Sequence, residues 1–253
     1  MRGLLIDVTR CVGCGACVEA CCEQNHLPPQ ADELSDKQFT VLRKIRNRRG
    51  EIYYRRLCMH CLDPACASVC PIGALKKTPE GPVTYNPSIC MGCRYCLQAC
   101  PFDAPRYEWN SLAPRLGKCS LCAERLMQGG TTACAEVCPT GATLCGEREE
   151  LLREARARIA SAPGSYLPKI YGEHQAGGTS VLYLSSVPFR QLGLPENLPP
   201  MPLPALTFRA LSQIPFLVGF AGLSLTGLWW LTNRKHEVAR SEGGKTGLRE
   251  GKP

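Results

Sequence analysis

The residues best suited to chemistry in this sequence are its 18 cysteines, all of which fall between Cys11 and Cys145. Sixteen of them form four groups of four, which in chain order are Cys11, Cys14, Cys17 and Cys21; Cys58, Cys61, Cys66 and Cys70; Cys90, Cys93, Cys96 and Cys100; and Cys119, Cys122, Cys134 and Cys138. Cysteine at this density indicates disulfides, zinc sites or iron–sulfur clusters, and the spacing must decide among them.

The first and third groups follow the pattern C-x2-C-x2-C-x3-C. Three thiolates at this spacing can hold three corners of a cubic iron–sulfur cluster from one loop. Disulfides are disfavoured, because cysteines crowded onto one turn leave no partners with Cα atoms about 4.4 to 6.8 Å apart. Zinc is disfavoured because the third cysteine of each run has no role in a tetrahedral site. Attached haem is excluded, because no Cys-x2-Cys here is followed by His.

The fourth cysteine of a ferredoxin run ligates the other cluster of a pair, so four groups predict four clusters. Pro71, Pro101 and Pro139 directly follow the last cysteine of the last three groups. A residue without N–H and with a fixed φ ends the local helix there. The first group departs from this rule, because Cys22 follows Cys21.

Three stretches carry a resemblance to a known family: CMHCLDPACASVCP, CMGCRYCLQACPFDAPRY and KCSLCAERLMQGGTTACAEVCPTGA. They resemble the four-cluster ferredoxin subunits of membrane-bound respiratory oxidoreductases, over roughly residues 4 to 232. The chain is similar both to the iron–sulfur subunit of type 2 nickel–iron hydrogenases and to the formate dehydrogenase beta subunit. The resemblance implies an α+β fold of two pseudo-symmetric bacterial ferredoxin-like units, each with two clusters, followed by a C-terminal arm and a single transmembrane helix.

The resemblance also implies that the first group shares two clusters with the fourth, and the second group with the third. Cluster 1 would take Cys11, Cys14, Cys17 and Cys138, and cluster 2 would take Cys21, Cys119, Cys122 and Cys134. Cluster 3 would take Cys58, Cys61, Cys66 and Cys100, and cluster 4 would take Cys70, Cys90, Cys93 and Cys96. Every ligand is cysteine, so four [4Fe-4S] clusters are expected. Cys22 and Cys145 lie outside this pattern and are expected to be small buried apolar side chains, with redox regulation as the alternative.

The formal net charge is +8 with neutral thiols. Four oxidised clusters with their thiolates would contribute about −8, which leaves the loaded protein nearly neutral. Seven basic residues gather in one stretch: Arg43, Lys44, Arg46, Arg48, Arg49, Arg55 and Arg56. We interpret them as a solvated or partner-facing surface, with tuning of nearby clusters and nucleic-acid binding as alternatives. The near-neutral loaded protein disfavours nucleic acid.

Residues 1–146 are predicted to form the four-cluster domain. Leu151, Leu152, Ala155 and Ile159 fall on one side of a helical pattern, so residues 147–162 are predicted to form a surface helix. Glycine and proline recur over residues 163–208, around one strand-like run at Ser180–Leu184. This composition predicts an extended arm that reaches a membrane or a partner.

A run of 24 uncharged residues lies between Arg209 and Arg234 and predicts a transmembrane helix over 209–233. Trp229 and Trp230, followed by basic residues, suit a membrane interface better than a buried core helix. Lys and Arg are enriched in the tail, 234–253, which should therefore be cytoplasmic, with the iron–sulfur domain in the periplasm of the bacterial inner membrane. Ten residues precede Cys11 and leave no room for a signal peptide, so export is expected to depend on a partner.

No nucleotide-binding loop or acid–base pair stands out, so no catalytic residue is predicted. We expect an electron-transfer subunit that conducts electrons through the clusters to a membrane quinone-reactive subunit. The resemblance implies, as the other partner, a periplasmic catalytic subunit of a nickel–iron hydrogenase or of a molybdenum or tungsten formate dehydrogenase. Membrane lipid is expected around the span, and nucleic acid is not expected as a partner. The alternatives are a subunit of another molybdopterin oxidoreductase, a free-standing redox enzyme or sensor, and a structural zinc module.

Overall fold

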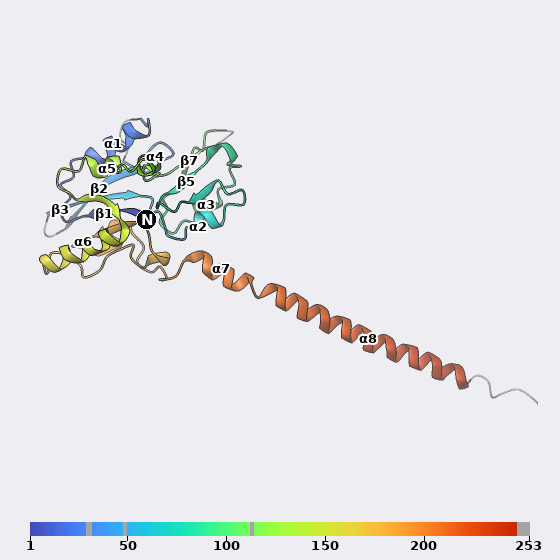
Figure 1. Cartoon of the computed structure of the whole chain (residues 1–253). Helices are drawn as coiled ribbons and strands as arrows, with labels where there is room; N and C mark the ends of the chain where they lie inside the picture. Colours follow the sequence, from blue (N-terminus) through green and yellow to red (C-terminus); the bar gives the residue numbers. More distant parts are fainter. Residues whose placement is uncertain (29–31, 48–49, 112–113, 247–253) are drawn as a thin grey trace, which may run out of the picture. The chain divides into compact units, whose positions relative to one another are not determined.

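A computed structural model of the chain describes residues 1–28, 32–47, 50–111 and 114–246. The chain divides into two compact units, Met1–Pro204 and Ala205–Pro253 (Figure 1). All 18 cysteines lie in the first unit. The two units are therefore described separately, and every candidate site belongs to the first.

A mixed three-stranded sheet forms the centre of the first unit. Its order is β8 (Thr143–Glu147), β1 (Arg2–Asp7) and β9 (Val181–Leu184). β8 runs antiparallel to β1, and β9 runs parallel to it. Leu4 and Leu5 of β1 point to opposite faces of the sheet, and both are fully buried because each face is covered.

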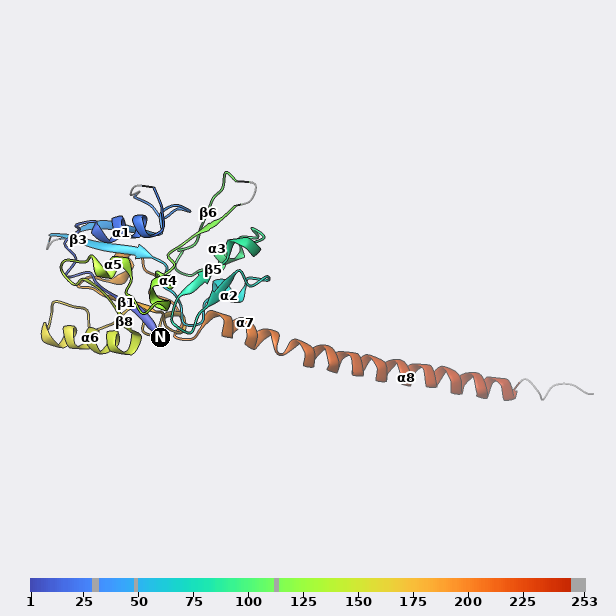
Figure 2. The ribbon, with the colours of Figure 1, turned by 45° about the horizontal axis from the view of Figure 1, so that its top comes forward.

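Helix α6 (Arg148–Ser161) covers one face of this sheet, where its Leu151, Leu152 and Ala155 pack against Leu5. The helix runs where the amphipathic pattern predicts one. The opposite face carries the larger core cluster, in which Leu4 and other residues of β1 and β9 meet aromatic side chains. Figures 1 and 2 both show α1 and α6 on opposite sides of β1.

The elements that carry the cysteines form two halves of the first unit. Half A holds the first and fourth groups on α1 (Ala16–Gln24), α4 (Ala123–Met127), α5 (Ala133–Glu136) and the hairpin β2 (Thr40–Asn47)–β3 (Gly50–Leu57). Half B holds the second and third groups on α2 (Ala65–Ser68), β4 (Leu75–Lys77), β5 (Val83–Tyr85), a 3-10 turn (Pro87–Ile89), α3 (Tyr95–Ala99), β6 (Arg106–Tyr107) and β7 (Leu116–Gly117). Both views place α2 and α3 away from α1 and α5.

The cysteine loops of the two halves share backbone conformations. Gly15 and Arg94 occupy the same place in the first and third groups, and both have positive φ, 83° and 66°. His60 and Leu121 precede the second cysteine of the second and fourth groups, with φ of 48° and 55°. Positive φ is uncommon for residues other than glycine, so these loops are held in shape by their surroundings.

The arm predicted over residues 163–208 is wrong for residues 163–204, which belong to the first compact unit. Tyr171, Tyr183, Phe189 and Leu192 are at most 1% exposed and form part of the main core. The strand-like run is confirmed as β9, and 3-10 turns occur at Gln175–Gly177 and Phe189–Leu192. The physical reason is that the glycines and prolines make turns between apolar residues, and burying those residues stabilises the packed form.

The second unit is helical throughout its described part. α7 (Leu203–Leu211) and α8 (Ile214–Thr246) are separated only by Ser212 and Gln213. The segment Leu203–Arg240 is long and apolar enough to cross a membrane, and it is the one such segment in the described residues. α8 continues beyond the predicted span into the predicted basic tail, whose last residues, 247–253, lie outside the described part.

Candidate iron–sulfur sites

The cysteines predicted for cluster 1 line one cavity of about 460 Å³ in half A: Cys11, Cys14, Cys17 and Cys138. The first two come from the loop before α1, the third from its first turn, and the fourth from the segment before β8. The thiols of Cys17, Cys138 and Cys14 also act electrostatically on Cys11. Three residues near the N-terminus thus meet one that is more than 120 positions away.

The cysteines predicted for cluster 2 line a second cavity, of about 350 Å³: Cys21, Cys119, Cys122 and Cys134. Cys21 comes from α1 and Cys134 from α5, and the other two come from the segment just before α4. α1 therefore contributes to both cavities of half A, because Cys17 and Cys21 are one helical turn apart and point into neighbouring spaces.

Half B brings together the other two predicted sets. A cavity of about 310 Å³ is lined by the four cysteines of cluster 4: Cys70, Cys90, Cys93 and Cys96. The cysteines of cluster 3 act on one another: the thiols of Cys58, Cys100 and Cys66 act electrostatically on Cys61, which is half-buried. The tertiary structure thus gathers all sixteen cysteines into the four predicted sets. Their role as ligands stays a prediction.

The space between the sulfurs fits a polynuclear cluster better than one metal ion. Zinc would draw its ligands to about 2.3 Å from one centre. In the described residues no three His, Cys, Asp or Glu side chains converge closely enough to share one ion.

Backbone amides are directed at several of the sulfurs. The amide of Ala74 donates to Cys70 Sγ at 3.2 Å, that of Leu121 to Cys119 Sγ at 3.3 Å, and that of Thr143 to Cys138 Sγ at 3.4 Å. Hydrogen bonds of this kind stabilise a thiolate and are one determinant of a cluster's reduction potential. The donors lie in both halves.

Burial raises the pKa of the Cys21 and Cys66 thiols to about 12, with further contributions from neighbouring thiols, Cys134 and Cys58 respectively. Burial likewise raises the pKa of Cys96 to about 11. Without a metal these thiols are protonated at neutral pH, so iron binding must release their protons. Burial also raises the pKa of Cys90, but the hydroxyls of Tyr107 and Tyr85 outweigh it and lower the value overall.

Neighbouring sets lie close enough to influence one another electrostatically, or they share a lining residue. Arg55 lines the cavities of both set 1 and set 2. Cys58 of set 3 acts electrostatically on Cys119 of set 2, and Cys96 of set 4 acts on Cys66 of set 3. The four sets therefore follow one another as 1, 2, 3 and 4. Cys14 in set 1 and Cys93 in set 4 are the two cysteines exposed at the surface.

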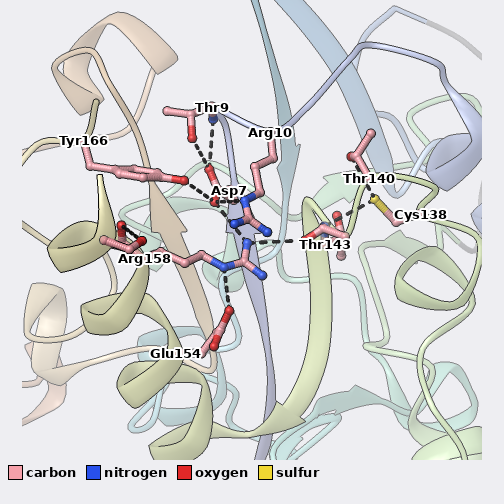
Figure 3. A network of polar contacts seen from close by, with 11 residues as sticks. Asp7, Thr9, Arg10, Cys138, Thr140, Thr143, Glu154, Arg158 and Tyr166 are labelled. Atoms are coloured by element: carbon pink, nitrogen blue, oxygen red, sulfur yellow. Dashed lines mark hydrogen bonds and ion pairs between the residues drawn. The ribbon is translucent and has the colours of Figure 1, made fainter. Parts of the chain in front are cut away.

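A buried ion pair fixes the segment that carries Cys138 (Figure 3). Asp7 is fully buried at the end of β1, and its Oδ2 accepts from Arg158 Nη1 at 3.0 Å and from the Tyr166 hydroxyl at 2.9 Å. Arg158 Nη1 also donates to the Gly141 carbonyl at 3.3 Å, just before β8. The network therefore joins α6, β1 and the chain between Cys138 and β8.

Sequence reasoning missed three buried polar side chains near these sites. Arg55 is 2% exposed, although the basic stretch that contains it is predicted to face solvent or a partner. His60 is fully buried and accepts from the Val83 amide through Nδ1, and Lys118 is 5% exposed. Strand alternation could have indicated that Arg55 is buried, because Arg55 shares a face of β3 with the buried Leu57.

The two cysteines outside the four sets differ in their surroundings. Cys22 is buried as expected, and its Sγ lies 3.9 Å from Gln38 Oε1. Cys145, on β8, is half-buried and packs against the main core cluster. Neither lines any of the three cavities formed by the predicted sets.

Family models match two parts of the chain. The model described as a 4Fe-4S dicluster domain matches residues 51–148, and the one described as a 4Fe-4S binding domain matches residues 4–21. Together they span the sixteen cysteines of the four sets. They bear out the prediction of [4Fe-4S] binding in the first unit.

Curated relatives extend the similarity to most of the chain. The hydrogenase-2 operon protein HybA of Escherichia coli O157:H7 is 41% identical over 238 residues, covering 77% of this chain and 73% of the relative. The iron–sulfur subunit of the nitrate-inducible formate dehydrogenase of Escherichia coli K12 is 37% identical over 213 residues, covering 76% and 72%. A protein of Nitratidesulfovibrio vulgaris is 40% identical over 257 aligned residues, covering 95% and 69%.

Proposed function

Since this chain belongs to the ferredoxin-type iron–sulfur electron-transfer subunits of membrane-bound respiratory oxidoreductases, we propose that it conducts single electrons through four [4Fe-4S] clusters. The electrons pass between a periplasmic catalytic subunit and a membrane subunit that reacts with quinone. The chain itself carries no catalytic site in this proposal. Its role is to hold and insulate the clusters.

The order of the four cysteine sets is the observation that carries this proposal. Sets 1 to 4 succeed one another, and the exposed cysteines Cys14 and Cys93 belong to the first and last of them. A row of redox centres that reaches the surface at both ends suits conduction between two partners. A free-standing enzyme or sensor would need only one such opening.

Each set would hold one cluster, which supplies one-electron chemistry when bound. The cysteines provide four thiolates per cluster, and the amides of Ala74, Leu121 and Thr143 stabilise the negative charge on sulfur. The repeated loop conformations at Gly15 and Arg94 support two pseudo-symmetric ferredoxin-like units. These units correspond to halves A and B.

Exposed apolar side chains lie near both exposed cysteines in the sequence. Val12, two residues before Cys14, is 60% exposed, and Met91 and Tyr95, two residues on either side of Cys93, are 65% and 61% exposed. Exposed apolar side chains at the ends of a redox row suit docking of partner proteins. We assign one end to the catalytic subunit of a hydrogenase or formate dehydrogenase and the other to the quinone-reactive subunit.

The apolar segment Leu203–Arg240 would anchor the protein in the bacterial inner membrane. Basic residues follow the span, beginning with Arg234 and Lys235, and by the positive-inside rule they support a cytoplasmic C-terminus. The four-cluster domain then lies in the periplasm.

The test is purification of the tagged full chain from detergent-solubilised membranes, followed by metal and sulfide analysis. Four clusters predict about 16 iron and 16 sulfide per chain, before iron in the partners is counted. Co-purified nickel would identify a hydrogenase complex, and molybdenum or tungsten would identify a formate dehydrogenase or a related enzyme. Zinc with little iron would overturn the proposal.

A further inference from the structure

Arg55 is a buried cation that forms no ion pair with a carboxylate in the described part of the chain. Its side chain projects from β3, which pairs with β2, and the residue is 2% exposed. None of its three guanidinium nitrogens, Nε, Nη1 and Nη2, has a nitrogen or oxygen partner there, and the nearest acceptor is the thiol of Cys17. Its backbone carbonyl accepts from the hydroxyl of Tyr183 at 2.7 Å.

The surroundings of Arg55 identify where a negative charge could lie. Arg55 lines the cavity of set 1 and also the cavity of set 2. The groups that favour its charged form are the thiols of Cys134, from set 2, and Cys17, from set 1, together with Tyr183. The guanidinium therefore lies between the two sets of half A.

Half B shows a contrast. The cavity of set 4 is lined by its four cysteines and by apolar and tyrosine side chains, among them Leu75, Tyr85 and Tyr107, and by no charged residue. Set 3 of half B has the cations Lys118 and Lys77 nearby, but both donate hydrogen bonds to backbone carbonyls, those of Val83 and Gly81. Arg55 differs from them because its side chain has no oxygen partner in the described residues.

An arginine in this position stays positively charged. The guanidinium stays protonated in proteins and carries five N–H donors. A buried ion without a counter-charge is strongly unfavourable, and buried charges are accordingly paired. A cluster with four thiolates carries negative charge. Clusters in the two adjoining cavities would therefore supply the counter-charge for Arg55 that the polypeptide does not supply.

We propose that Arg55 is the shared counter-ion of clusters 1 and 2 and raises the reduction potentials of both. This inference rests on the proposed function, because it requires both clusters. Reduction adds one electron, and hence one negative charge, to a cluster, while Arg55 keeps its proton and is neither oxidised nor reduced. A fixed cation stabilises the reduced form more than the oxidised form and lessens repulsion between electrons on neighbouring clusters.

The experiment compares three variants of the full chain, purified in its complex from membranes: Arg55→Met, Arg55→Lys and Arg46→Met. Iron per chain is measured first, and redox titration followed by electron paramagnetic resonance then gives the potential of each cluster. In Arg55→Met we expect the equilibrium constant for reduction to fall at least tenfold, about 59 mV, at two of the four clusters. Arg55→Lys retains the charge and should shift those two by less than half as much.

Arg46→Met removes the same charge from the same hairpin at an exposed position, so solvent and salt should leave all four potentials unchanged. Loss of two clusters in Arg55→Met but not in Arg55→Lys would also support the counter-ion role. The inference fails if Arg55→Met holds all its clusters and shifts the potential of none of them, or shifts all four potentials equally. It also fails if Arg55→Lys shifts the potentials as far as Arg55→Met does, or if both variants lose clusters. Wild-type protein without iron would instead overturn the proposed function.

Discussion

Cysteines in this protein differ mainly in what surrounds them. The sixteen cysteines of the four sets face one another, and twelve of them line the three cavities of sets 1, 2 and 4. Cys22 directly follows Cys21 in the chain but lies outside those cavities, beside Gln38. Adjacent residues on one helix thus point into different environments, and only one of the two is placed to bind a cluster.

Replacing Cys70 by serine should therefore remove or alter one cluster only. A serine hydroxyl is a poor substitute for a thiolate, so iron in the purified chain should fall by about a quarter, or four of 16 atoms, if the cluster is lost. The matched control is Cys22→Ser, which should keep the full iron content. Equal loss of iron in both variants would contradict the assignment of cysteines to sets.

The buried Asp7–Arg158 ion pair leads to a second prediction for a single residue, which concerns stability. Arg158→Met leaves the Asp7 carboxylate fully buried with only Tyr166, Thr9 and the more distant Arg10 beside it. Breaking a buried ion pair in this way costs about 3 kcal/mol. For a unit of this size the midpoint of thermal denaturation should fall by about 6 °C or more.

Arg153→Met is the control for that change, because the Arg153–Glu150 pair is largely exposed on the same helix. An exposed pair contributes at most about 1 kcal/mol. Denaturation of the loaded protein, followed by loss of its visible colour, measures both variants. If the two midpoints fall equally, the buried network does not stabilise the fold as we expect.

At the scale of elements, β1 depends on close approach at one glycine. A Cβ at Gly3 would collide with the backbone carbonyl of Ser180, which leads into β9. Gly146 is the register partner of Gly3 on β8, yet a Cβ there would only make an ordinary contact with Leu151, at 3.6 Å. An added methyl group is therefore expected to fit at Gly146 on β8 but not at Gly3 on β1.

Gly3→Ala should destabilise the first unit by about 1–3 kcal/mol, because the added methyl forces β1 and β9 apart. Gly146→Ala should change the stability by less than about 0.5 kcal/mol. Thermal denaturation of both variants gives the comparison. A Gly3→Ala protein as stable as wild type would show that β9 does not pack against β1 as described.

At the scale of the whole molecule, the boundary at Pro204 separates a cysteine-bearing unit from an apolar helical one. The main core of the first unit includes aromatic residues as late in the chain as Phe189. A chain that ends at Pro204 keeps that core, whereas a chain that ends directly after the last cysteine would lose it. The boundary inferred from cysteines alone, at residue 146, is therefore too early for a folding unit.

Residues 1–204 expressed alone should be soluble without detergent and brown from bound clusters. The truncation removes nearly all of Leu203–Arg240, the one segment among the described residues that is long and apolar enough to cross a membrane. Fractionation of cells that lack the partner subunits measures the distribution, with the full chain as the membrane-bound control. Recovery of the truncated chain in the membrane fraction would count against the anchoring role.

The proposed orientation predicts where the C-terminus lies. A reporter that is active only in the cytoplasm, fused after the last residue, should be active. One that requires the periplasm should be inactive, because the basic residues after the span stay on the cytoplasmic side. Exchanging Arg234 and Lys235 for glutamine should weaken this preference. The reverse pattern of reporter activity would refute the periplasmic location of the clusters.

The sequence alone determined the chemistry of the site and several elements. The spacing of the cysteines is local, since three thiolates two residues apart can bind one cluster from a single loop, and so it can be interpreted without a fold. Helix α6, strand β9 and the apolar span were likewise predictable, because each has a periodicity or a composition of its own. The family then followed from the order of the motifs.

Only the tertiary structure decided what joins distant parts of the chain. It brought Cys138 beside Cys11, packed the predicted arm into the core, and buried Arg55 between two cavities. None of these outcomes is encoded in a local pattern, because each depends on which surfaces meet when apolar residues far apart in the sequence are buried together. A basic residue in a charged stretch is predicted to be exposed to solvent, and only the fold shows that Arg55 is buried.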